Sequence, residues 1–464
     1  MRPDHPEIIA TTSDAETTSD HERPRDHERP VTRQITIREL LRRNRNFRYL
    51  WLAQLVSFLG DWFNTLAVYD LTNELTGGSG QALAWVLISR FIPTFVFSAM
   101  AGVLADRLSR KKIMIAADLL RAVVVLGFLF VRRPEHLWIV YALTAAQLSF
   151  SAFFQPARDA AVPTITTRAE LLAANALGGA SWAVMLALGA AAGGLVTELA
   201  GRNAAFVIDA ATFLFSAAMV RQVLIPKRTR PPAGPLTIAS LTGWTDLVDG
   251  GRYVLAHPAV GWLLMVKLGW GLGGGVLLLL VVFGERVFTP GGAAGVGILY
   301  AARGIGSAIG PFLARRLGGE SPRSMRQAIA FGFACAGLFY IAFSYAGGLG
   351  VAVVALLGAH TGGSILWVFS TTLLQLAVPD RYRGRVFAAE WALVTLSMSI
   401  SSYLTGMAID AGGDPRTLAR FLGVAFLAPG LVWVLAQRSV AGRLEEHIAA
   451  RQHDEERPAE PEVV

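Results

Sequence analysis

Residues 102–112 read Gly-Val-Leu-Ala-Asp-Arg-Leu-Ser-Arg-Lys-Lys, and they lie between two apolar runs, 82–104 and 112–131. Each run is about 20 residues long, the length of helix that crosses the hydrocarbon core of a bilayer. Five of the eleven quoted residues are charged. Apolar runs alternate with short charged clusters in the same way along the rest of the chain. The pattern therefore predicts an integral membrane protein built from helices.

The composition of the whole chain supports this prediction and excludes several functions. Of 464 residues, 53% are hydrophobic and 16% are charged, whereas soluble proteins have about 45–50% apolar and about 25% charged residues. The single cysteine, Cys335, excludes an internal disulfide and a cysteine-based zinc site. The chain lacks a P-loop, H-E-x-x-H or G-x-S-x-G pattern, so we expect neither an ATPase nor another enzyme. We also expect no metal and no cofactor. The net charge of +8 would suggest a nucleic-acid partner for a soluble protein. In a membrane protein the positions of the basic residues matter more than their sum, so we expect no nucleic-acid partner.

Breaks at charged and Gly/Pro clusters divide the chain into twelve candidate spans. They are 47–69, 82–104, 112–131, 137–157, 172–198, 203–223, 259–284, 295–315, 325–345, 350–377, 385–409 and 416–437. The predicted domains are a disordered tail (1–46), a six-helix half (47–223), a linker (224–258), a second six-helix half (259–437) and a polar tail (438–464). The second part of the linker, 236–257, is predicted to be an amphipathic helix on the membrane surface.

Basic residues predict the orientation. If the N-terminus is inside, the loops on that side carry about sixteen Lys and Arg and the opposite loops about five. We therefore expect a multi-pass protein of the plasma membrane with both termini in the cytoplasm. Leu104–Leu108 and Leu313–Leu317 follow spans two and eight and echo each other. This echo favours an all-α fold made by duplication of six helices.

The stretch 102–112 resembles the signature loop of the major facilitator superfamily of secondary transporters, with Ser109 where glycine is usual. Other stretches resemble the branch that contains macrolide-efflux proteins and the enterobactin exporter. They are Gly60–Trp62, Arg90–Pro93, Asp118–Arg121, Gln155–Arg158, Asp209–Ala210 and Arg383–Phe387. The antiporter pattern of span five survives only as Gly189–Gly194, without its proline.

The resemblance implies two six-helix halves that rock about a central site and open to each side in turn. It implies a monomeric, proton-coupled exporter of an amphiphilic small molecule, such as a drug or a siderophore. Two alternatives remain open. One is a lipid or lysolipid transporter of the same fold, and the other is a membrane receptor or assembly factor that moves no solute.

Three charged residues of the first half are candidates for proton coupling. Asp61, Arg90 and Asp209 all lie about 20 Å from the cytoplasmic end of their spans, counting 1.5 Å per residue. Equal depth permits Arg90 to pair with both carboxylates across a shared cavity. Intramembrane charges face a cavity or one another, so the alternative is a static Asp61–Arg90 pair with Asp209 bound to the backbone.

In the second half, Lys267 lies in the seventh span, and Arg303 and His360 lie near the middle of the membrane. Lys267 and Arg303 have no acidic residue at their own depth in that half. They would suit an anionic substrate, or they would pair with Asp61 or Asp209 across the halves. His360 titrates near neutral pH in principle, and a histidine hydrogen-bonded within the bundle is the alternative.

The remaining candidates are predicted to form a cytoplasmic gate, with ordinary solvation at the membrane surface as the alternative. Asp118 and Arg121 have the i, i+3 spacing of a pair within one helix. The predicted gate comprises Gly102, Asp106, Arg107, Arg110, Lys111, Asp118, Arg121, Arg158 and Glu390.

Overall fold

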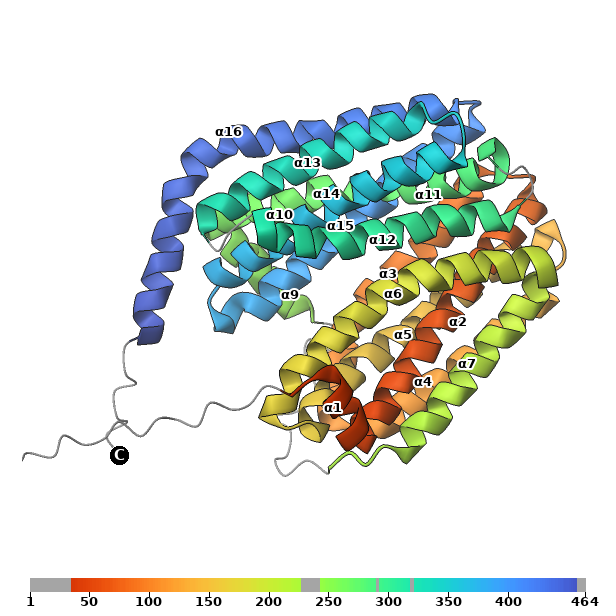
Figure 1. Cartoon of the computed structure of the whole chain (residues 1–464), viewed down its shortest axis with the longest axis horizontal. Helices are drawn as coiled ribbons and strands as arrows, with labels where there is room; N and C mark the ends of the chain where they lie inside the picture. The colour runs from red at the N-terminus through yellow and green to blue at the C-terminus, as the bar shows by residue number, and fades with distance from the viewer. Residues whose placement is uncertain (1–34, 227–242, 289–291, 318–320, 457–464) are drawn as a thin grey trace, which may run out of the picture. The chain divides into compact units, whose positions relative to one another are not determined.

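A computed structural model describes residues 35–226, 243–288, 292–317 and 321–456, and this part of the chain is helical and contains no strand (Figure 1). The first group of helices is α1 (Ile37–Arg43), α2 (Arg45–Thr76), α3 (Gly80–Arg107), α4 (Arg110–Gly127), α5 (Leu137–Ile165), α6 (Arg168–Ala200) and α7 (Arg202–Gln222). The second group is α9 (Trp244–Ala256), α10 (Pro258–Gly271), α11 (Gly274–Val282), α12 (Ala293–Leu317), α13 (Pro322–Ser344), α14 (Leu349–Ala377), α15 (Asp380–Asp410) and α16 (Pro415–Glu456). Short 3-10 turns occupy Phe128–Phe130 and Pro134–His136, and a π-helical turn occupies Phe283–Phe288.

The predicted membrane spans are confirmed in eleven cases. Eleven segments of the described residues are long and apolar enough to cross a bilayer, and α10, α11 and the π-helical turn together make one of them, Pro258–Phe288. Helix α2 corresponds to the first predicted span and is 32 residues long, but it is not among the eleven. Its polar side chains, which include Gln54, Asp61 and Asn64, lower its hydropathy.

The structure corrects several predicted ends. The seventh span continues past residue 284 through the π-helical turn, which buries Glu285 at 4% exposure. Helix α16 runs to Glu456, into the predicted polar tail 438–464, and α1 lies within the predicted tail 1–46. The linker helix is α9, and residues 227–242 lie outside the described residues, as do 1–34 and 457–464. The helices therefore extend beyond the apolar runs, because polar end residues continue a helix once its core is anchored.

A break divides the seventh span where its glycines cluster. Helix α10 ends at Gly271 and α11 begins at Gly274. A Cβ at residue 274 would lie 2.3 Å from the backbone oxygen of Met398 on α15. Only glycine allows α11 to approach the α15 backbone this closely.

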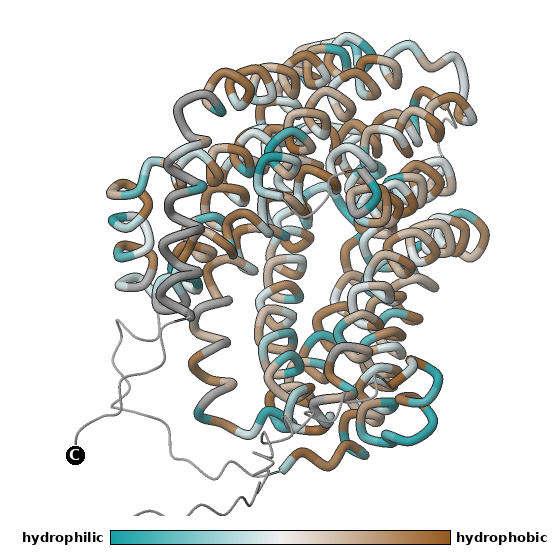
Figure 2. Tube along the Cα trace, turned by 60° about the vertical axis from the view of Figure 1, so that its left-hand side comes forward, coloured by the Kyte–Doolittle hydropathy of each residue, from teal (hydrophilic) through white to brown (hydrophobic). Residues whose placement is uncertain are grey.

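Consecutive helices alternate in direction, so the connections gather at two ends of the bundle (Figure 1). We call the end with residues 77–79, 345–348 and 411–414 the Asp410 end, and the end with residues 108–109, 166–167 and 378–379 the Arg110 end. Figure 2 shows hydrophobic residues along the helices and hydrophilic residues gathered towards many helix ends. We call α2–α7 the first half and α10–α16 the second half. The halves meet mainly where α3 packs on α15 and α6 packs on α12.

At the Asp410 end, a carboxylate of the second half caps a helix of the first half. Asp410, the last residue of α15, accepts hydrogen bonds from the Ser79 hydroxyl at 2.8 Å, the Gly80 N–H at 2.6 Å and the Gln81 N–H at 3.1 Å. The free N–H groups at the start of α3 are donors that need a partner from outside the helix. We refer to these three hydrogen bonds as the Asp410 cap.

A second contact between the halves lies beside the Asp410 cap. The Arg286 guanidinium, from the π-helical turn, donates to the Gly78 carbonyl and, at 3.3 Å, to the Asn73 side-chain oxygen. The two contacts together fasten the first half to the second at this end.

Candidate functional site

The first half contains a chain of buried polar side chains that starts at Asp61 on α2. The Gln147 amide on α5 donates to Asp61 Oδ1 at 3.4 Å, and Asn64 Nδ2 donates to Gln147 Oε1 at 2.5 Å. Gln147 and Asn64 are each 1% exposed. These amides hold the Asp61 carboxylate between α2 and α5.

A fully buried ion pair continues this network on α4. Asp118 is 0% exposed and binds the Arg121 guanidinium, as its i, i+3 spacing predicts. The Ser216 hydroxyl on α7 donates to the other oxygen of Asp118 at 2.7 Å. Arg121 lies between the rings of Phe154 and Phe213, with centroid distances of 4.9 and 4.2 Å. Two aromatic faces and one carboxylate therefore hold the Arg121 guanidinium in place.

Asp209 on α7 is the most isolated carboxylate of the network. It is 0% exposed, its Oδ1 accepts from the Thr212 hydroxyl at 3.3 Å, and its Oδ2 has no hydrogen-bond partner in the described residues. A Cβ at Gly60 on α2 would lie 2.4 Å from Asp209 Oδ1. Gly60 therefore lets α2 approach α7 closely enough to bring Asp61 within Coulombic range of Asp209.

Two arginines of the first half act on the Asp61 and Asp209 carboxylates. Within the described residues Arg90 forms no ion pair, although it interacts electrostatically with Asp61 and Asp209. Arg121 also lies within Coulombic range of the same two carboxylates. Arg121 was expected in the gate, but α4 carries it about 16 Å in from the Arg110 end, at 1.5 Å per residue. Among the described residues, Arg121 has a direct carboxylate partner in the network, Asp118, and Arg90 has none.

In the second half, the structure gives Lys267 the acidic partner that the sequence did not indicate. Lys267 on α10 is 0% exposed and lies 3.4 Å from Glu390 of α15. It donates to the Thr371 hydroxyl at 2.7 Å, and its Nζ lies 3.4 Å from the ring centroid of Trp367. Glu390, which was expected in the gate, pairs with Lys267 across α10 and α15. The prediction of an unpaired Lys267 is wrong.

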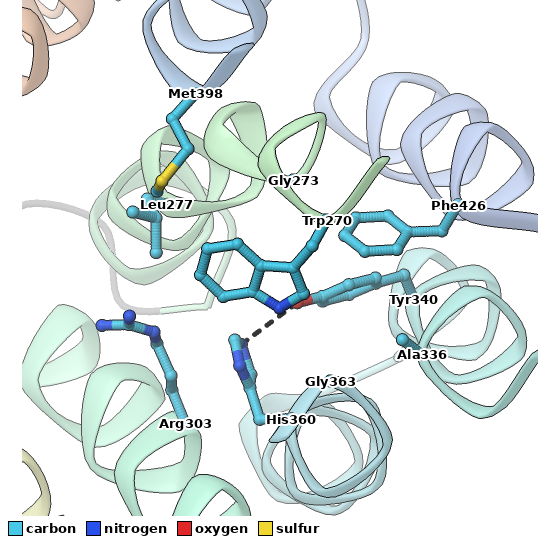
Figure 3. Close-up of a pocket in the computed structure, with 10 residues that line it drawn as sticks. All are labelled: Trp270, Gly273, Leu277, Arg303, Ala336, Tyr340, His360, Gly363, Met398 and Phe426. Atoms are coloured by element: carbon cyan, nitrogen blue, oxygen red, sulfur yellow. Dashed lines mark hydrogen bonds between the residues drawn. The ribbon is translucent and has the colours of Figure 1, made fainter. Parts of the chain in front are cut away.

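Arg303 and His360 border a small cavity inside the second half (Figure 3). The cavity has a volume of about 20 Å³, which is room for one water molecule. The Tyr340 hydroxyl and His360 Nε2 are 3.2 Å apart, so His360 is hydrogen-bonded within the bundle, one of its two predicted states. The other lining residues are Trp270, Gly273, Leu277, Ala336, Gly363, Met398 and Phe426.

Three of the other predicted gate residues contact groups of the first half. Arg110 donates to the Ala160 carbonyl at 2.7 Å, and Lys111 donates to the Val223 carbonyl at 2.9 Å. Arg158 pairs with its neighbour Asp159 at 2.8 Å. Arg107 is half-buried near the end of α3, and the side chains of Gly102 and Asp106 lie outside the described residues.

Several residues of the site were missed. Asn64 and Gln147 are polar residues within apolar runs, so the criterion that selected Asp61 could have selected them. Glu285 lay one residue beyond a predicted span end. Nothing in the sequence pattern indicated the Asp410 cap. Among residues 35–226, 243–288, 292–317 and 321–456, no group of three or more His, Cys, Asp or Glu is placed to hold a metal ion.

Comparison with known proteins agrees with this architecture. The sequence profile of the Major Facilitator Superfamily matches residues 50–402. The chain is 26% identical over 362 residues to the putative bacilysin exporter BacE of Bacillus subtilis, covering 77% of this chain and 87% of that protein. It is 27% identical over 411 residues to the enterobactin exporter EntS of Shigella boydii, covering 85% and 92%. An uncharacterized MFS-type transporter of Bacillus subtilis, YfiS, is 25% identical over 414 residues, covering 86% and 93%.

Solved structures show the same fold at low identity. The nucleoside transporter NupG superimposes with a TM-score of 0.63 at 12% identity, covering 84% of this chain and 98% of that one. The peptide transporter PepTSo superimposes with a TM-score of 0.66 at 12% identity, covering 86% and 98%. Profile, relatives and fold agree: the chain is a transporter that belongs to the Major Facilitator Superfamily.

Proposed function

We propose that this protein is a proton-coupled exporter that moves an amphiphilic small molecule by alternating access. Relatives that cover most of the chain are named as exporters of bacilysin and of enterobactin. Both names support export as the direction of transport. The proposed exporter works as a monomer in the plasma membrane, and its two halves are residues 47–223 and 259–437 with a linker between them.

The observation that carries proton coupling is the Asp209 carboxylate. It has no exposed area, one oxygen without a partner, and the Asp61 carboxylate within Coulombic range. Arg121 lies within Coulombic range of Asp61, but it is already bound to Asp118. An ionised carboxylate in a membrane interior is costly without a partner, and a bound proton removes that cost. Asp209 therefore takes up a proton in the arrangement described here and releases it when the helices around it separate.

The contacts between the halves support alternating access. The Asp410 cap and the Arg286 contact fasten the halves at the Asp410 end. Basic residues are concentrated in the loops of the Arg110 end, so this end faces the cytoplasm and both termini lie there. The arrangement is then one in which the outer end is closed.

The test is drug accumulation in an efflux-deficient bacterial host, measured with a panel of fluorescent and radiolabelled compounds. Cells that express the protein should accumulate less of at least one compound, and a protonophore should abolish the difference. Asp209→Asn and Asp61→Asn should abolish it too, because an amide cannot carry the proton. Glu135→Gln, an exposed residue in the 134–136 turn, is the matched control and should export normally.

Each other outcome refutes part of the proposal. Export that survives both substitutions and the protonophore would refute proton coupling. Normal accumulation of every compound, with the protein verified in the membrane, would refute small-molecule export and favour lipid transport or a role without transport.

A further inference from the structure

We propose that the cavity beside Arg303 binds the carboxylate of the transported molecule. The inference rests on the proposed function only in attributing the carboxylate to the transported molecule. The binding site itself is argued from the second half alone, and its test requires no transport.

The first observation is that Arg303 lacks a partner. Its guanidinium forms no hydrogen bond or ion pair with the residues that the structure describes, and its Nε is buried without a partner. Its one ring contact is with Tyr300, at 5.8 Å. An arginine keeps its charge at any physiological pH, and an unpaired charge inside a membrane protein is costly. Lys267 in the same half differs, because Glu390 balances it.

The second observation is that the cavity wall offers hydrogen-bond donors and no carboxylate. Figure 3 shows His360 of α14 reaching toward the Trp270 indole, and Arg303 of α12 beside it with its guanidinium on the side of Leu277. Gly363 borders that indole, since a Cβ at residue 363 would lie at ordinary contact distance, 3.4 Å, from Trp270 Nε1. Within the described residues the Trp270 N–H has no hydrogen-bond partner. The Tyr340 hydroxyl, paired with His360, completes the polar part of the wall. Donors without acceptor charges select an anion.

The third observation is the shape and surroundings of the cavity. Its volume of about 20 Å³ is that of one water molecule, so it takes one carboxylate oxygen in place of a water while the rest of the ligand lies at the mouth of the cavity. Leu277, Met398 and Phe426 supply an apolar wall beside the donors. A planar carboxylate matches the guanidinium fork in two hydrogen bonds, and an adjoining apolar group can contact the three apolar side chains. The ligand chemistry is therefore a carboxylate attached to an apolar body.

The position of Arg303 connects the cavity to the contact between the halves. Tyr300 lies one turn before Arg303 on α12 and packs on Trp62 and Tyr69 of α2, with centroid distances of 5.6 and 6.1 Å. Arg303 itself is half-buried. A carboxylate at Arg303 is thus held beside the surface along which the two halves separate.

The test uses the full-length protein in phosphatidylcholine nanodiscs and titration calorimetry at fixed ionic strength. The probes are benzoate and benzamide, which differ in charge but little in shape. Benzoate should bind the natural protein at least about tenfold more tightly than benzamide, because hydrogen bonds to a charged group are the stronger ones. Arg303→Gln should raise the Kd for benzoate by about tenfold or more. Arg316→Gln, an exposed arginine at the end of the same helix, should leave it unchanged.

A second variant guards against misfolding. Arg303→Lys keeps the charge but loses the planar fork, so its Kd for benzoate should lie between those of the natural protein and Arg303→Gln. Thermal unfolding midpoints of all variants show whether they are folded. A Kd in folded Arg303→Gln equal to that of the natural protein would overturn the proposal, as would the absence of benzoate binding.

A chloride titration distinguishes the two sources of an anion. If chloride competes fully with benzoate and binds more tightly, the site belongs to a free halide and the assignment to a carboxylate is wrong. Binding and transport are also separable. A protein that binds benzoate through Arg303 but does not lower drug accumulation keeps this site and loses the export proposal. A protein that exports normally but does not bind benzoate keeps the export proposal and loses this site.

Discussion

Replacing Asp410 by alanine should open the Asp410 end of the protein. The carboxylate accepts three hydrogen bonds from Ser79, Gly80 and Gln81, two of them from backbone N–H groups at the start of α3. Removing the cap of a helix costs about 0.5–2 kcal/mol, and charge-assisted hydrogen bonds lie at the upper end of that range. Asp410 is exposed, so screening by water limits the expected loss to about 1–2 kcal/mol.

This loss acts only on the closed arrangement, because the cap joins the two halves and is absent when they separate. A change of about 1–2 kcal/mol shifts the ratio of closed to open molecules by a factor of about 5–30. Asp410→Asn should have a smaller effect, since its amide oxygen still accepts from one N–H group but carries no charge.

The shift can be measured by pulsed electron–electron double resonance between spin labels on the two halves. Suitable sites are Asn203 at the start of α7 and Gly350 at the start of α14, both exposed, in a Cys335→Ser background. The longer-distance population should grow in Asp410→Ala.

Asp414→Ala is the matched control, because Asp414 caps α16 of its own half through the Thr417 N–H at 2.9 Å and hydroxyl at 2.8 Å. Those hydrogen bonds hold the pKa of the Asp414 carboxyl below its usual range, so the residue that the control removes is charged at neutral pH. An Asp410→Ala distance distribution that matches both the natural protein and Asp414→Ala would refute the reasoning.

Two further predictions concern the buried networks. Gly60→Ala should destabilise the protein by about 1–3 kcal/mol and impair transport, because its Cβ would lie 2.4 Å from Asp209 Oδ1. Gly179→Ala is the control: its Cβ meets nothing within 4 Å, so it should raise the thermal unfolding midpoint slightly. Equal effects of the two substitutions would contradict the packing argument. Lys267→Met should lower the free energy of unfolding by about 3–5 kcal/mol, because it leaves the Glu390 charge buried and unpaired. The double variant Lys267→Met with Glu390→Leu should recover most of that loss. A double variant whose unfolding midpoint shows only the sum of the two single effects would mean that the ion pair contributes nothing.

The fold could be predicted from the sequence because the dominant force acts locally. The thickness of the bilayer core sets the length of a spanning apolar run at about 20 residues. Such runs identify the spans without any knowledge of tertiary contacts. The ends were less certain, as Glu285 shows. A charged residue normally marks the end of a span, but here the π-helical turn carries it into a buried position. Hydropathy cannot distinguish these cases, since the difference lies in what packs around the residue.

The sequence predicted which residues belong to the candidate site, but not which of them pair with each other. Depth along a helix selected Asp61, Asp209, Lys267 and Arg303, and each lies within the bundle. Depth does not give the rotation of a helix about its axis or the choice of neighbour. Lys267 was therefore predicted without its partner Glu390. Pairs within one helix are the exception, because their geometry is local, and the Asp118–Arg121 pair was predicted correctly.

The polarity of α2 has a consequence for how the protein is made. Helix α2 precedes its partners α6 and α7 in the chain, yet it carries Asp61 where an aspartate costs about 2.5–3.5 kcal/mol to insert into lipid. Asn64 and Gln54 add to that cost. The groups that satisfy these side chains, such as Gln147 on α5, are synthesised later. Helix α2 is therefore a poor membrane segment alone, and its stable insertion depends on α5 and α7. We therefore expect assembly of the first half to be cooperative, with α2 inserting stably only together with the helices that satisfy its polar side chains.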